Sequence, residues 1–125
     1  MTTVNSIHAD DHGSNDGSVS IYTWSPLTTT NTDGAAIGAI QFADRSVQVS
    51  GTFGAGGSLS IQGSNDGSNW FTLNNAQGTA ATFTSAGLKQ VVELPRYIRP
   101  FVSAGDGTTS LTVVMVARRQ NPLRT

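Results

Sequence analysis

The residues of this chain that could bind a metal ion stand near its start, at His8, Asp10, Asp11 and His12. Imidazole nitrogens and carboxylate oxygens are ligands for zinc or nickel. Two histidines four positions apart share a face only on a helix, and Gly13 argues against a helix that continues. We therefore interpret this segment as a solvated polar stretch, and we predict neither a metal nor a cofactor.

Catalytic chemistry has few candidate residues in this chain. There is no cysteine, and both histidines lie near the start, where a preorganised nucleophile and base are hard to build. Glu93 is the single glutamate, so a carboxylate pair for glycoside hydrolysis is hard to assemble. The segment Gly-Ser-Asn-Asp-Gly-Ser occurs at 13–18 and 63–68, with one Asp and no Glu, which favours tight turns over calcium loops. We predict no catalytic residues and no enzyme activity.

Tryptophan and arginine are the side chains best suited to contact a protein partner. Trp70 stands beside Phe71, so alternation along a strand sends the two rings to opposite faces. The stretch that contains Arg96 and Arg99 mixes charged, aromatic and apolar residues on both faces, which is typical of an interface. The predicted protein-contact residues are Trp70, Arg96, Arg99, Arg118 and Arg119.

The overall composition narrows the class of partner. Seven basic residues against eight acidic ones give a net charge of −1, which argues against a nucleic-acid partner, because such a protein needs a basic face. Charged residues make up only 12% of the chain, so the surface consists largely of uncharged polar residues. No apolar run approaches the roughly 20 residues that cross a bilayer, and the start lacks the parts of an export signal. We expect synthesis in the cytoplasm, protein partners and no membrane.

Apolar and polar residues alternate with a period of two through the middle of the chain, which predicts strands. Turn residues separate these runs, which cover 46–53, 58–62, 71–73, 81–84 and 88–94. In the last of them, Leu88, Val92 and Leu94 are expected to share one face, opposite Lys89 and Glu93. A chain of 125 residues is long enough for one domain with a hydrophobic core, so we predict a single domain built from these strands.

Four further stretches complete the predicted strands. The run 111–117 is apolar on both faces and predicts a central strand, or a strand whose second face a partner covers. Prolines bracket 96–99, which predicts a strand that is short, bent or at an edge. The segments 19–24 and 37–42 are weaker strand candidates. The fold predicted is an all-β jelly roll or antiparallel β-sandwich of about eight strands over 18–118, with an N-terminal arm (1–17) and a C-terminal tail (119–125).

Two resemblances meet at the hairpin that ends in Trp70. Gly63 to Trp70 fits a Gly-Ser-Asn-Asp-Gly-x-x-Trp pattern and resembles discoidin-type jelly rolls that bind carbohydrate or lipid, which would place Trp70, Asn65 and Asp66 at a sugar site. From about Val47 to Arg119, the order SIQGSNDGSNWFTL and then ELPRYIRPFVSAGDGTTSLTVVMVARR resembles small proteins encoded beside the major capsid protein in tailed bacteriophages. Some of these are jelly-roll cement or decoration proteins that clamp adjacent capsomers.

The second resemblance implies a structural role in a virus particle. It implies binding to the major capsid protein on the outer capsid surface, and to other copies of this chain as a dimer or trimer. The family has no catalytic residues to carry over, and residues 1–17 lie outside the resemblance. Two alternatives stay open, which are a discoidin-like carbohydrate-binding module and a tail or connector protein.

Overall fold

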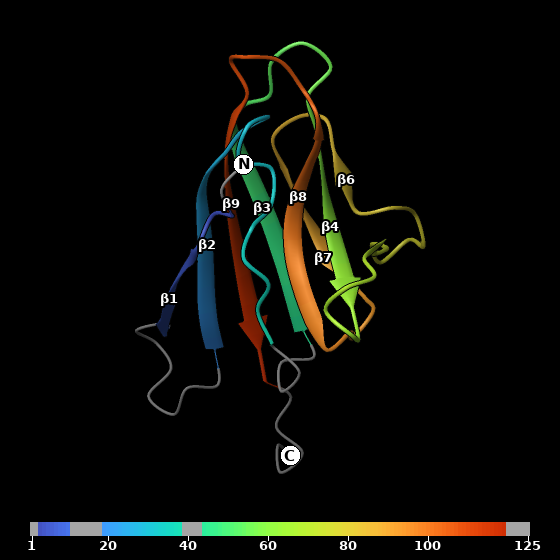
Figure 1. Cartoon of the computed structure of the whole chain (residues 1–125). Coiled ribbons are helices and arrows are strands. Elements are labelled where there is room, and N and C mark those ends of the chain that lie inside the picture. Colours follow the sequence, from blue (N-terminus) through green and yellow to red (C-terminus); the bar gives the residue numbers. More distant parts are fainter. Residues whose placement is uncertain (1–2, 11–18, 39–43, 120–125) are drawn as a thin grey trace.

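The computed structural model describes residues 3–10, 19–38 and 44–119, which form a sandwich of two antiparallel sheets (Figure 1). This part of the chain contains nine strands and no helix, so the predicted all-β sandwich is confirmed. None of the described residues forms a helix that could cross a membrane. The strands are β1 (Ser6–Asp10), β2 (Val19–Leu27), β3 (Asp44–Thr52), β4 (Ser58–Ser64), β5 (Phe71–Thr72), β6 (Thr82–Phe83), β7 (Gly87–Val91), β8 (Tyr97–Ala104) and β9 (Ser110–Arg118).

The larger sheet has the strand order β1-β2-β9-β3-β7. Its central strand β9 pairs along its whole length with β3, from Ser110 opposite Thr52 to Arg118 opposite Asp44. On its other side β9 pairs with β2. This position explains why the run 111–117 is apolar throughout, since one face lies in the core and the other carries the half-buried Val114 and Val116.

The smaller sheet is built around β4, which has β8 on one side and the short β5 and β6 on the other. The segment 32–37 lies along the outer edge of β8. Its hydrogen bonds are Val102 N–H to Thr32 O (2.9 Å), Gly34 N–H to Pro100 O (2.9 Å), and a mutual pair between Ile37 and Ile98 (3.0 Å each). With this segment counted as a strand, the chain passes between the two layers in the order of a jelly roll. The predicted strand 37–42 therefore contributes Ile37 to this edge, and residues 39–42 lie outside the described part.

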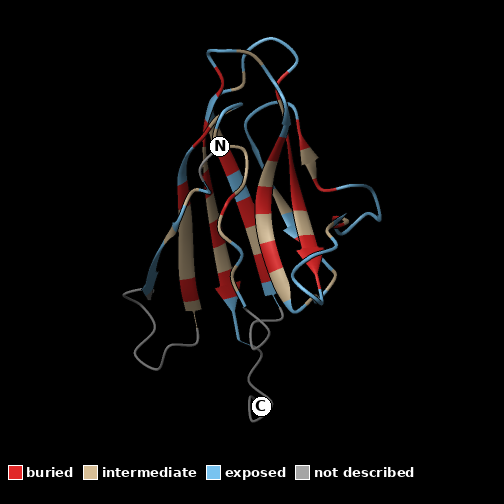
Figure 2. Cartoon of the chain, in the orientation of Figure 1, coloured by how far each residue is buried: buried red, intermediate tan, exposed pale blue. Residues whose placement is uncertain are grey.

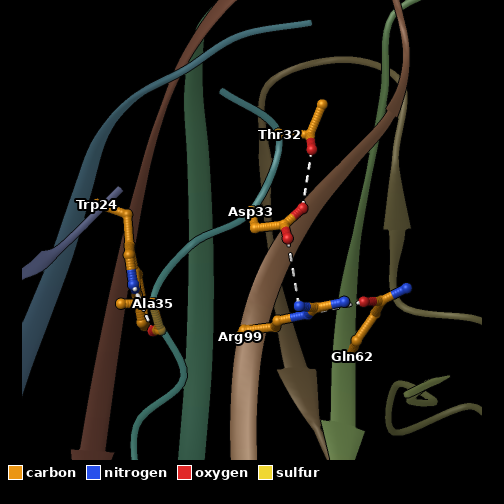
Figure 3. Close-up of polar contacts among 6 residues, drawn as sticks. All are labelled: Trp24, Thr32, Asp33, Ala35, Gln62 and Arg99. Carbon is orange, nitrogen blue, oxygen red and sulfur yellow. Dashed lines mark hydrogen bonds and ion pairs between the residues drawn. The ribbon is translucent and has the colours of Figure 1, made fainter. Parts of the chain in front are cut away.

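The core lies between the two sheets, and along the long strands buried residues alternate with less buried ones (Figure 2). Its largest member is Trp24, whose indole N–H donates to the carbonyl oxygen of Ala35 at 3.0 Å (Figure 3). Gly34 permits the close approach of this segment. A Cβ at position 34 would stand 2.5 Å from the Pro100 ring and 2.9 Å from Cδ1 of Trp24.

The prediction of which residues in and after β7 face the core is wrong. Leu88, Val92 and Leu94 are exposed, whereas Val91 is buried in the core. The register with β3 places Lys89 opposite Val47 and Val91 opposite Arg45, so the odd-numbered residues of β7 point toward the core. Lys89 is accommodated there because its Nζ lies over the Phe83 ring, 5.4 Å from the ring centroid.

The predicted N-terminal arm of residues 1–17 contains β1, which pairs with β2 at the edge of the larger sheet. His8 stacks on Tyr22, with 4.7 Å between ring centroids. Residues 11–17, which include His12, lie outside the described part, as do residues 120–125 of the predicted C-terminal tail.

Side-chain hydrogen bonds fix the turns of the sandwich. The Asp106 carboxylate accepts from Ala55 N–H (2.8 Å), Thr108 N–H (2.9 Å) and Thr108 Oγ1 (2.6 Å), so it joins two loops. In the 75–79 loop, Asn75 Oδ1 accepts from the Gln77 and Thr79 amides and from Thr79 Oγ1. These loops have a defined conformation because polar side chains satisfy their backbone donors.

We predict that Gly34→Ala destabilises the protein by about 1–3 kcal/mol, because the new methyl group overlaps Pro100 and Trp24 in a packed interior. Urea unfolding measures the free energy of unfolding. Gly107→Ala is the control, because a Cβ there meets no atom within 4 Å. Equal unfolding free energies for the two variants would contradict the close approach at Gly34.

We predict that Asp106→Asn lowers the free energy of unfolding at neutral pH. The asparagine side chain presents to the Ala55 N–H either its amide nitrogen, which cannot accept a hydrogen bond, or its amide oxygen, which is a weaker acceptor than a carboxylate. Hydrogen bonds, first from Thr108, lower the pKa of Asp106 to about 2 from an ordinary 3.8. A lowered folded-state pKa means that the stabilisation is complete above about pH 4 and is lost as the pH falls through 2. Denaturant unfolding from pH 6 to pH 2 should therefore show the gap between wild type and variant closing, and a constant gap would contradict this role.

Candidate functional site

The outer face of the smaller sheet carries the most distinctive group of side chains in the described structure. Along β8 the even-numbered Ile98 and Val102 are buried in the core, so Tyr97, Arg99 and Phe101 point outward. The register with β4 places Arg99 beside Gln62. Alternation on two neighbouring strands therefore brings charged, polar and aromatic side chains together on one face.

Arg99 lies at the centre of this group. Its guanidinium carbon is 4.1 Å from the centroid of the Trp70 ring and 5.5 Å from that of Phe101. Its Nε donates to Gln62 Oε1 at 3.0 Å, and its Nη1 donates to Asp33 Oδ2 at 3.5 Å (Figure 3). We call Asp33, Gln62, Trp70, Arg99 and Phe101 the Arg99 cluster.

The Arg99 cluster is a partly desolvated charged site. The side chains of Arg99 and Asp33 are each 18% exposed. Burial lowers the pKa of Arg99, while the Asp33 carboxylate opposes that shift. An arginine stays protonated in proteins, so the Arg99 guanidinium is a positive charge whose N–H donors point in fixed directions. Thr32 Oγ1 in turn donates to Asp33 Oδ1 at 2.8 Å and orients the carboxylate.

The hairpin 64–69 presents Trp70 to Arg99. The Asp66 carboxylate accepts from the amides of Ser68 and Asn69 (2.8 Å each), from Ser64 Oγ (2.9 Å) and from Asn69 Nδ2 (2.7 Å). These bonds, first those from Asn69, hold the pKa of Asp66 well below its usual range. Gly67 has φ +78°, which suits its place in so tight a turn. The hairpin is therefore a self-bonded, rigid support for Trp70.

A cleft of about 310 Å³ lies beside the same hairpin. Its apolar part includes Phe71, which is 70% exposed, and the cleft is lined by Gly63, Ser64, Asn65, Asp66, Asn69, Phe71, Leu73 and Pro95. Trp70 is not among the lining residues. The predicted sugar site of Trp70, Asn65 and Asp66 is thus divided between the cleft and the Arg99 cluster.

One fully buried arginine lies in the larger sheet. Arg45 is 2% exposed and donates from Nη2 to the carbonyl oxygen of Glu93, while its Nε has no partner among the described residues. Burial lowers the pKa of Arg45 against the charge of Glu93. Burial alone would raise the pKa of Glu93, but hydrogen bonds from Asn74 at 2.7 and 2.6 Å and the Arg45 charge outweigh it and lower that pKa. This pair ties β3 to the chain after β7.

Two of the five predicted contact residues come together, because Trp70 and Arg99 belong to the Arg99 cluster. The exposed Arg96 stacks instead on its neighbour Tyr97, with its guanidinium 4.9 Å from the ring centroid. Arg118 and Arg119 are exposed at the end of β9 in the other sheet. Whether any of the five contacts a partner stays a prediction.

The sequence analysis missed Asp33 and Gln62 as members of the cluster. Alternation in β4 could have indicated Gln62. Asp33 stands 66 positions before Arg99, in a segment without strand periodicity, so no local signal pointed to it.

Comparisons with known proteins give a fold and no family. No known protein-family profile matches the chain, and no curated protein matches it in sequence. The crystal structure of the SPBc2 prophage-derived protein YomS is similar, with a TM-score of 0.55 and 10% sequence identity over 79% of this chain and 93% of YomS. The chain therefore shares its fold with a prophage-derived protein.

We predict an energetic coupling between Trp70 and Arg99 of about 0.5–2 kcal/mol, because a stacked guanidinium that is partly desolvated is attracted to the indole face. A double-mutant cycle of Trp70→Leu and Arg99→Met in urea unfolding measures it. The same cycle with Arg96→Met and Tyr97→Leu is the control and should give a smaller coupling, since Arg96 is exposed. Additive effects at Trp70 and Arg99 would show that the stacking contributes nothing.

Proposed function

We propose that this protein is a structural component of a tailed-bacteriophage particle, which binds the outer capsid surface and bridges neighbouring major capsid subunits. The observation that carries the proposal is the Arg99 cluster, displayed on a jelly-roll fold shared with a prophage-derived protein, with Arg96 stacked on the neighbouring Tyr97. Tryptophan, tyrosine and arginine are the residues that most often dominate binding energy in protein interfaces.

Preorganisation supports a role in binding. Trp70 and Arg99 are already held by Gln62, Asp33 and the self-bonded hairpin. A partner would therefore meet side chains whose conformational entropy is already reduced, so little ordering cost remains at association. Charged residues make up only 12% of the chain, and uncharged polar groups cost less free energy to desolvate than charged groups do.

The positions of the arginines support bridging. The Arg99 cluster lies on the outer face of the smaller sheet, whereas Arg118 and Arg119 lie at the end of β9 in the larger one. Two separate contact regions allow one molecule to touch two capsid subunits. A typical interface covers about 800 Å² per partner. Many copies on one shell would make the summed attachment strong even where each contact is weak.

A carbohydrate-binding role is the second candidate, and the cleft beside the 64–69 hairpin is the observation that favours it. Phe71 offers an exposed aromatic face, and Asn65, Asp66 and Asn69 line the same cleft. The Asp66 carboxylate already accepts four hydrogen bonds, so a sugar would rely on the amide side chains. No feature of the described structure favours a tail or connector protein.

The proposal is tested by mixing purified protein with undecorated capsids from the major capsid protein of the same phage, followed by sedimentation. We expect saturation at a fixed ratio of copies per capsid subunit and greater resistance of the capsids to heat. Arg96→Glu and Arg118→Glu should each weaken binding, while Ser85→Glu, at an exposed turn, should bind like wild type.

Absence of saturable binding would overturn the capsid role. A glycan panel on the same preparations then distinguishes the second candidate. Glycan binding that Phe71→Ala abolishes and Trp70→Ala preserves would assign the cleft to carbohydrate.

A further inference from the structure

The edges of the two sheets differ in how they are covered. The outer edge of β8 is hydrogen-bonded to the segment 32–37, and β5 and β6 have only two residues each. At the end of β7, Val91 forms a β-bridge with Asn75, and the next residue, Val92, donates its N–H to Asn74 O at 3.1 Å. Within the described residues, β1 pairs with β2 alone, and its other side forms a sheet edge.

β1 also lacks three of the features that keep edge strands from pairing. These three features are a lysine, a proline and a bulge. β7 has one of them, which is Lys89. β1 has the sequence Ser-Ile-His-Ala-Asp, its register with β2 is unbroken, and Ile7 is 73% exposed.

We propose that β1 is a dimerisation strand, which pairs antiparallel with β1 of a second copy of this chain and joins the two larger sheets into one. Antiparallel pairing of a strand with its own copy is symmetric about a two-fold axis, so the same groups are satisfied on both chains and the assembly closes. A head-to-tail contact between β1 and β7 would instead meet Lys89 and the 74–75 segment. The dimer does not depend on the capsid role.

Ile7 is the side chain that gains most from this pairing. The cross-strand register places Ile7, Thr23, Val114, Gln48 and Leu88 in one row on the outer face of the larger sheet. Ile7 and Leu88 therefore stand at the two ends of the same row, and Leu88 is 64% exposed. An axis near Ile7 brings the Ile7 side chains of both copies next to one another and removes them from water, whereas Leu88 stays outside the contact.

This arrangement supplies a matched pair of variants. Sedimentation velocity on the full chain should show a dimer for wild type. Ile7→Lys should raise the dissociation constant of the dimer by about tenfold or more, because it places like charges across the axis. Leu88→Lys introduces the same charge at the opposite end of the row and should remain dimeric.

A second measurement keeps the proposal testable if Ile7→Lys disturbs folding. The chain has no cysteine, so Ile7→Cys introduces a single thiol. Directly facing residues of an antiparallel pair lie about 4.5–5.5 Å apart at Cα, which a disulfide spans. Mild oxidation should link Ile7→Cys into a covalent dimer and leave Leu88→Cys unlinked. A monomeric or trimeric wild type, an unchanged dimer for Ile7→Lys, or equal cross-linking of the two cysteine variants would overturn the proposal.

Discussion

The hydrogen bonds between the segment 32–37 and the outer edge of β8 are the interaction on which the other features depend. A strand edge leaves a row of backbone donors and acceptors without partners, and this segment supplies them for β8. The same segment accepts the indole N–H of Trp24 and so completes the core. It also carries Asp33 to Arg99. One stretch of irregular chain therefore closes the smaller sheet, covers the largest core side chain and assembles the candidate site.

Sequence patterns predicted the strands that have one buried face and one polar face. The alternation in β3 and β4 has a simple physical cause, which is a register that places every second residue in the core. The run of β9 is apolar throughout because the strand is central, with Val114 and Val116 half-buried on its outer face. β7 shows the limit of that reasoning. Apolar residues occur at both parities there, and the pairing with β3, a long-range contact, decides that Val91 and not Leu88 is buried.

The candidate site was predictable only in part for the same reason. The types of Trp70 and Arg99 indicated a contact surface, but their meeting depends on the Asp66-bonded hairpin and on the β4–β8 register. Asp33 reaches the site through an irregular segment held by backbone hydrogen bonds, which leave no residue pattern. β1 was not expected as a strand because its five residues are too few to show a period against a polar background.

The loop 75–79 has a property that follows from how it is closed. Asn75 N–H donates to the Thr79 carbonyl oxygen at 2.7 Å, and Asn75 Oδ1 accepts from the N–H and Oγ1 of Thr79 across the base of the loop. At its tip, Gly78 has open space around the position of a Cβ. Since the ends of the loop are fixed by their own bonds, a foreign peptide grafted between them would cost mainly loop-closure entropy, which grows slowly with length. The molecule thus offers a natural place for epitope display, on a scaffold that carries no thiol to interfere with chemical conjugation.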